Sequence, residues 1–167
     1  METHVDLHAL VQAAGDAIIV ADVEGRIVLW NPAAERLFGF TAAEAAGGSL
    51  NLIIPERFRE RHWTGYHTVM QTGQRRYGTQ LLRVPSLRKD GQRLSIAFTV
   101  ALLHVPDGRR TGIAAIVRDD TERWQEEQTL RRRLAALEGR GASAYGEMME
   151  KALPEVYLAR HGETAFI

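Results

Sequence analysis

Residues 22–40, DVEGRIVLWNPAAERLFGF, decide the fold expected of this chain. The stretch predicts the end of one strand, a tight turn that includes Gly25, a second strand and then a short amphipathic helix. Glycine can adopt the positive φ that such a turn often requires. Asn31 can cap the free amides of the helix, and Pro32 fits its first turn at no cost. The apolar residues expected on one face of this helix are Ala33, Leu37 and Phe40.

The rest of the chain predicts three more strands after a helical region. The five strand-like segments are residues 17–21, 26–30, 78–87, 92–104 and 111–118. Between the second and third segments, Thr41 and Glu44 form a capping box for a short helix, and a longer helix is expected over residues 56–72. Pro85 in the third segment predicts an edge strand or a bulge, because proline cannot donate a ladder hydrogen bond. This order favours an α+β domain over residues 16–120, with a five-stranded antiparallel sheet and short helices on one face.

Amphipathic helices are expected on both sides of that domain. Residues 1–15 contain an apolar stripe at helical spacing and predict an N-terminal flanking helix. Residues 121–138 predict an output helix in which Leu130, Leu134 and Leu137 have the 4-then-3 spacing of a coiled-coil seam. The seam covers only about two heptads, so it is weak alone. We expect two copies of the chain to pair through these helices; the alternative is a surface helix that folds back onto the sheet.

The stretch quoted above resembles the PAS sensory domains, in the pattern D-x-x-G-R-I-x-x-W-N-x-A-A-E-R-L-F-G-F. The resemblance covers about residues 5–123. Its last part is the D-D-T-E-R segment that leads into the output helix of such domains, with Asp119, Thr121, Glu122 and Arg123. The resemblance implies a PAS fold with a pocket between sheet and helices. It also implies that a change in the pocket or in the dimer contact is transmitted through the C-terminal helix.

The composition excludes several functions. Among 167 residues there are 21 basic and 21 acidic side chains, and this zero net charge argues against a general nucleic-acid or membrane-surface binder. There is no cysteine, which excludes disulfides, thiolate metal sites and the PAS photosensors that form a flavin–cysteine adduct. No secretory signal and no run of roughly 18 apolar residues is present, so we expect a soluble cytoplasmic protein. The resemblance to PAS domains implies a small-molecule ligand, whose identity the sequence does not give.

The segment P-E-R-F-R-E-R-H, residues 55–62, resembles the oxygen-sensing haem PAS domains of nitrogen-fixing bacteria. The resemblance implies that His62 is an axial haem ligand, a role that suits a neutral imidazole on a helix facing an apolar sheet. The alternative is an ordinary helix histidine that is solvated or bonded to backbone. Those haem domains also use an arginine on the following strand, whose ungapped position here is Leu82, while Arg83 should point the other way. The five-residue spacing to His67 does not favour a two-histidine metal site, and none is expected.

Residues 139–167 are expected to be a linker followed by an incomplete or disordered tail. The sequence VYLARHGET at residues 156–164 resembles the opening strand and motif of the histidine phosphatase (phosphoglycerate mutase-like) superfamily. The motif residues are Arg160, His161, Gly162 and Glu163. The resemblance implies that this histidine takes a phosphoryl group whose charge the arginine neutralises. Phosphoryl transfer also needs further cations, a second histidine and an acid, and the chain stops soon afterwards, so we expect a truncated phosphatase segment without enzymatic activity.

Overall fold

The computed structural model describes residues 4–74 and 78–138. The predicted tail, including its R-H-G-E motif, lies outside the described residues. The elements are α1 (Leu7–Ala13), β1 (Ala17–Asp22), β2 (Ile27–Trp30), α2 (Pro32–Phe38), α3 (Ala42–Ala45), the 3-10 helix η1 (Leu50–Leu52), α4 (Glu56–Thr72), β3 (Leu82–Leu87), β4 (Arg93–His104), β5 (Arg110–Asp119) and α5 (Thr121–Leu137).

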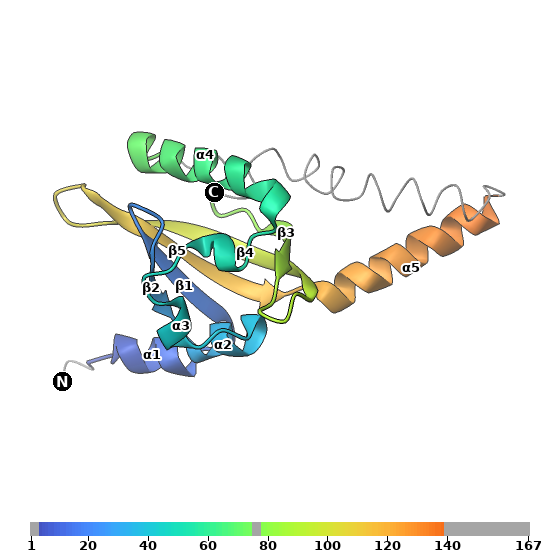
Figure 1. The fold of residues 1–167 in the computed structure, drawn as a ribbon, viewed down its shortest axis with the longest axis horizontal. Coiled ribbons are helices and arrows are strands. Elements are labelled where there is room, and N and C mark those ends of the chain that lie inside the picture. The colour runs from blue at the N-terminus through green and yellow to red at the C-terminus, as the bar shows by residue number, and fades with distance from the viewer. Residues whose placement is uncertain (1–3, 75–77, 139–167) are drawn as a thin grey trace.

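The strands form one antiparallel sheet in the order β2-β1-β5-β4-β3 (Figure 1). The pairing of β1 with β5 joins the two N-terminal strands to the later three, as the sequence predicted; Ala17 lies opposite Val117. Pro85 lies in β3, which is an edge strand, so that prediction is confirmed as well. The fold is therefore the α+β sheet expected from the sequence.

One face of the sheet carries the core. Side chains alternate along a strand, so inward-facing residues of β1, β3, β4 and β5 gather on a single surface. Helices α2 and α4 contribute Phe38 and Phe58 to this surface, and the loop after η1 contributes Ile53 and Ile54. The buried sheet residues of this core include Ala17, Ile19, Leu82, Val84, Leu94, Ile96, Phe98 and Val117. The expected placement of short helices on one face is therefore confirmed.

The α2 helix differs from its predicted pattern. Its buried residues are Ala33, Ala34 and Phe38, whereas Leu37 and Phe40 are only half-buried. Gly39 takes a left-handed conformation with φ 81° and ends the helix, so Phe40 no longer follows the helical period. Both side chains nevertheless pack against the core, as predicted; the prediction missed the fully buried Phe38 and assumed a helix two residues too long.

The turn between β1 and β2 adopts the predicted conformation, with Gly25 at φ 80°. Tertiary packing restricts this position further, because a Cβ atom on Gly25 would lie 2.1 Å from the indole ring of Trp63 on α4. The third strand starts at Leu82 rather than Gly78, which has a positive φ of 53° and lies in a turn. Among the described residues, no helix is both long and apolar enough to span a membrane.

Candidate functional site

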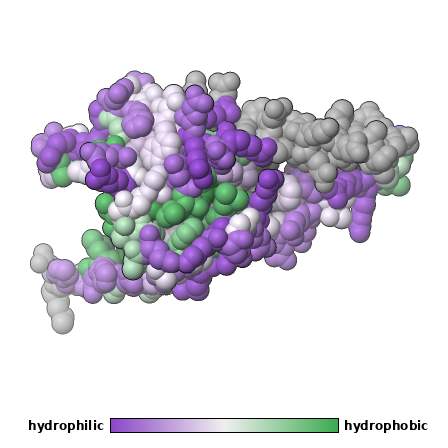
Figure 2. Space-filling view, in the orientation of Figure 1, coloured by the Kyte–Doolittle hydropathy of each residue, from purple (hydrophilic) through white to green (hydrophobic). Residues whose placement is uncertain are grey.

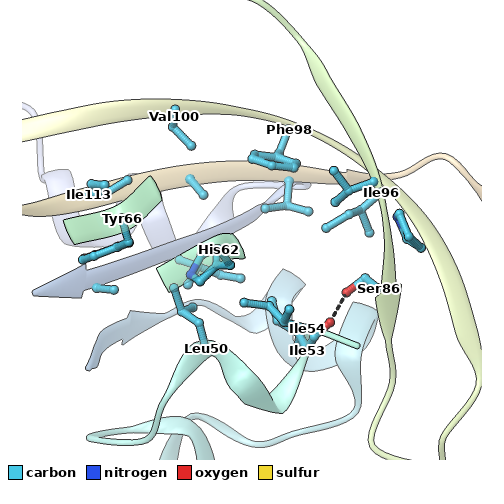
Figure 3. A pocket seen from close by; sticks show the side chains of 16 residues that line it. Leu50, Ile53, Ile54, His62, Tyr66, Ser86, Ile96, Phe98, Val100 and Ile113 are labelled. Atoms are coloured by element: carbon cyan, nitrogen blue, oxygen red, sulfur yellow. Dashed lines mark hydrogen bonds between the residues drawn. The ribbon is translucent and has the colours of Figure 1, made fainter. Parts of the chain in front are cut away.

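A cavity of about 80 Å³ lies between the sheet and the α4 side of the core (Figure 3). Its walls combine residues from four strands, from α4 and from the η1 region. The lining residues are Ile19, Ala21, Leu50, Ile53, Ile54, His62, Tyr66, Val84, Pro85, Ser86, Ile96, Phe98, Val100, Ile113, Ala115 and Val117. Figure 2 shows an apolar surface between α4 and α2, framed by hydrophilic side chains. This is the pocket that the resemblance placed between sheet and helices.

Two of the three polar side chains in the cavity wall donate to backbone carbonyls. The Tyr66 hydroxyl donates to the carbonyl of Asp22, and the Ser86 hydroxyl donates to the carbonyl of Ile53 at 2.7 Å (Figure 3). Burial raises the pKa of Tyr66 above its usual value, and the nearby Asp22 carboxylate adds to this effect. The tyrosine is therefore neutral at physiological pH and keeps the proton it donates.

His62 is the third polar side chain in the wall. It is buried on α4, where its ring meets Trp63 edge-on with centroids 4.7 Å apart and lies 5.9 Å from the Tyr66 ring. The alternative of a solvated helix histidine is therefore wrong for this position. In the parts of the chain that the structure describes, no cluster of three or more metal-ligating side chains occurs.

The cavity offers a side chain that could bind haem iron, but its volume is too small for a haem. His62 offers an imidazole at the wall, as an axial ligand requires. However, pockets for drug-sized ligands measure about 300–1,000 Å³, several times the 80 Å³ found here. Leu82 is buried and Arg83 points to the other face, where it pairs with Asp120 at 3.3 Å. The cavity as it stands is too small for a haem, and Arg83 points away from it as its register predicted.

The junction between the sheet and α5 is held by hydrogen bonds to Ser95 on β4. The Asp120 amide donates to the Ser95 carbonyl at 2.8 Å, and the Ser95 amide donates to the Thr121 hydroxyl at 3.0 Å. The Asp119 carboxylate accepts from the Thr121 amide at 2.9 Å. The start of α5 is therefore bonded directly to the backbone of a cavity-lining strand.

The Asp120 carboxylate is engaged by two arginines instead of capping α5. It lies 3.3 Å from Arg83 of β3 and 2.7 Å from Arg123 of α5. Asp120 occupies the N-cap position of α5, but its side chain makes no capping hydrogen bond. Glu122 is exposed. The sequence predicted that Arg83 faces away from the cavity. It did not predict that Arg83 binds Asp120 at the start of α5.

The α5 helix extends away from the sheet (Figure 1). Leu130, Leu134 and Leu137 are 63%, 58% and 85% exposed. Leucines packed against the sheet would be buried, so the alternative of a helix folded back onto the domain is wrong. The three leucines therefore form a solvent-exposed apolar stripe along α5.

Comparison with known proteins identifies the family. The family described as the PAS fold matches residues 6–119, and the chain belongs to it. An uncharacterised protein of Azorhizobium caulinodans is 36% identical over 125 residues, which cover 74% of this chain and 17% of that protein. The sensor protein FixL of Bradyrhizobium diazoefficiens is 33% identical over 130 residues, which cover 77% of this chain and 25% of FixL.

A solved structure agrees at the level of the fold. The PAS domain of a protein from Colwellia psychrerythraea gives a TM-score of 0.60 at 23% identity and covers 69% of this chain and 94% of that one. The chain spans a quarter or less of the length of the two curated relatives. The family match ends before the R-H-G-E motif, and these findings give no support to the resemblance of the tail to histidine phosphatases.

Proposed function

We propose that this chain is a cytoplasmic signal-sensing module that transmits a change in its cavity, or in its contact with a second copy, through α5. The observation that carries the proposal is the exposed leucine stripe of α5 on a helix bonded at its start to the cavity-lining strand β4. The naming of FixL as a sensor protein supports the same role.

The coupling follows from the alternation of side chains along β3 and β4. Val84 and Ser86 face the cavity, while Arg83 on the opposite face binds the start of α5. On β4, Ile96 lines the cavity and its neighbour Ser95 bonds to α5. A strand that shifts when the cavity changes must therefore shift the residues that hold α5, because both sets share one backbone.

The second half of the proposal is a homodimer. Leu130, Leu134 and Leu137 expose apolar surface to water on α5. Pairing two copies along this stripe would bury that surface. The exposed apolar residues Val5, Leu7 and Leu10, in and before α1, provide a second apolar surface at the other end of the domain (Figure 1). A dimer whose helices change register or stability is a two-state element that the cavity can bias.

The experiment measures the mass of the full 167-residue chain by analytical ultracentrifugation over a range of concentrations. The parent is expected to be a dimer, and the variant Leu130→Ser/Leu134→Ser is expected to be a monomer with an unchanged circular dichroism spectrum. The control Gln125→Ser/Ala136→Ser changes two exposed positions on the opposite side of α5 and should remain dimeric. A monomeric parent at several hundred micromolar, or a leucine variant that stays dimeric, would overturn the proposal.

Haem-based sensing with His62 as the axial ligand is the second candidate. Its support is the burial of His62 at the cavity wall, and the small cavity volume weighs against it. A PAS-regulated phosphatase rests on the sequence of Arg160–Glu163 alone. Nothing in the described residues favours it, so we do not propose it.

A further inference from the structure

The cavity under α4 is lined almost entirely by hydrocarbon from the sheet, α4 and the loop before it. Ile19 and Val117 come from the centre of the sheet, Ile96 and Phe98 come from β4, and Ile54 comes from the loop before α4. Charged side chains are absent from its lining residues, as far as the structure describes them. A charged ligand would lose its hydration here without a compensating ion pair, at a large cost in free energy. The cavity therefore selects uncharged molecules.

The two hydroxyl groups of the wall form hydrogen bonds within the protein. The donor hydrogens of Tyr66 and Ser86 are both used on backbone carbonyls. The His62 ring meets the Trp63 ring edge-on and is tilted against the Tyr66 ring, and its imidazole is the one other polar side-chain group in the wall as the structure describes it. A ligand with several hydrogen-bonding groups would leave them unsatisfied, whereas an apolar ligand loses nothing on entry.

The volume sets the size of the ligand. An engineered cavity of about 150 Å³ lined by similar side chains stays dry and binds benzene, which has six heavy atoms. In proportion, the 80 Å³ present here accommodates about three heavy atoms. The same comparison excludes a haem, which is many times larger.

We propose that this cavity is a binding site for a small, uncharged, apolar molecule of about three heavy atoms, such as a short hydrocarbon, and not for haem. The idea that its occupancy is a signal rests on the function proposed above, whereas binding itself does not. A ligand of this size is limited to a Kd of about 1 mM or weaker, because even the best very small ligands gain little free energy per atom. The site therefore responds to high local concentrations of its ligand.

Xenon is the probe, and the readout is the shift of methyl resonances in the full chain under increasing xenon pressure. We expect saturable shifts at cavity methyls such as those of Ile19 and Val117. The filling variant Ala115→Leu should weaken binding by about tenfold or more, because the added methyl groups occupy the cavity. The matched control Ala114→Leu lies next to it on β5 and faces the other side of the sheet, so it should retain the shifts. Absent shifts, or shifts that survive Ala115→Leu, would overturn the proposal.

Benzene tests the size limit in the same assay. The parent should show no saturable shift with benzene, while Ile96→Ala should gain one, because the deleted side chain enlarges the cavity. Ile116→Ala removes the same atoms from the opposite face of the sheet, where Ile116 is half exposed, and should still reject benzene. If Ile96→Ala does not fold, Val117→Ala enlarges the same cavity by less. Benzene binding by the parent would refute the size limit.

Haem is tested by the visible spectrum of protein purified from haem-supplemented cells. We expect no Soret band in the parent. A Soret band that disappears in His62→Ala would overturn the proposal in favour of the haem candidate. These results are independent of the dimer experiment: failure of xenon binding does not change the mass of the chain, and a monomeric parent can still bind xenon.

Discussion

Asn31 joins three elements through one buried side chain, and its removal should be among the most damaging single changes outside the apolar core. Its amide oxygen accepts from the amides of Ile18 on β1 at 2.9 Å and Ala34 on α2 at 3.0 Å. Its amide nitrogen donates to the carbonyls of Val11 on α1 at 3.1 Å and Asp16 at 3.0 Å. The residue is fully buried, so water cannot replace these bonds in the folded chain.

The substitution Asn31→Ala removes all four hydrogen bonds and leaves two amides and two carbonyls without this partner. A net contribution of about 0.5–1.5 kcal/mol per bond gives a loss of roughly 2–6 kcal/mol in the free energy of unfolding. The loss of the cap of α2, about 1 kcal/mol, is contained in that figure. Since whole domains are stable by only about 5–15 kcal/mol, the change is a large share of the total.

Urea denaturation followed by circular dichroism measures this loss as a lower midpoint at an unchanged slope. The matched control is Asn51→Ala, because the half-buried Asn51 side chain accepts a single hydrogen bond, from the Trp63 indole at 2.8 Å. We expect that control to lose about 1 kcal/mol. If Asn31→Ala destabilises the chain no more than Asn51→Ala, the idea that one side chain couples α1, β1 and α2 is refuted.

Two further predictions concern the β1–β2 turn and one ion pair. Gly25→Ala should lower the free energy of unfolding by about 2–4 kcal/mol, because the new side chain combines a positive φ with a clash against Trp63. The control Gly91→Ala has a similar φ but open space around it, and should lose only about 1 kcal/mol. Equal losses in urea denaturation would contradict this prediction. The hydrogen bond from Arg118 lowers the pKa of Asp16, so this pair should stabilise the chain at neutral pH and stop doing so as the pH falls through the lowered pKa. The midpoint difference between parent and Asp16→Asn should therefore shrink between about pH 5 and pH 2, and a constant difference would show that the pair contributes nothing.

Local signals in the sequence determined most of the fold. Helix α4 has the predicted bounds, and Gly73 ends it in a left-handed conformation, because stop signals act within one turn of the chain. The capping box of Thr41 and Glu44 forms as expected for the same reason. Pro85 indicated an edge strand because its missing amide hydrogen is a property of the residue itself. Alternation along β3 likewise predicted that Leu82 and Arg83 would lie on opposite faces.

Other features depend on residues that are distant in the sequence. Asn31 was predicted as a helix cap, but its bonds to Val11 and Asp16 exist only because α1 returns to the start of α2. The pairing of Arg83 with Asp120 requires two strands to place them together, and no local pattern indicates it.

The sequence by itself determined the class of fold, the position of His62 on a helix that faces the sheet, and the leucine spacing of α5. Only the tertiary structure decided that those leucines are exposed and that the cavity beside His62 holds about 80 Å³. The physical reason is that periodicity specifies which side of an element is apolar, whereas a cavity is the small volume left between side chains from several elements. That volume changes with every contact among them, so it is a property of the packed molecule and of no single segment.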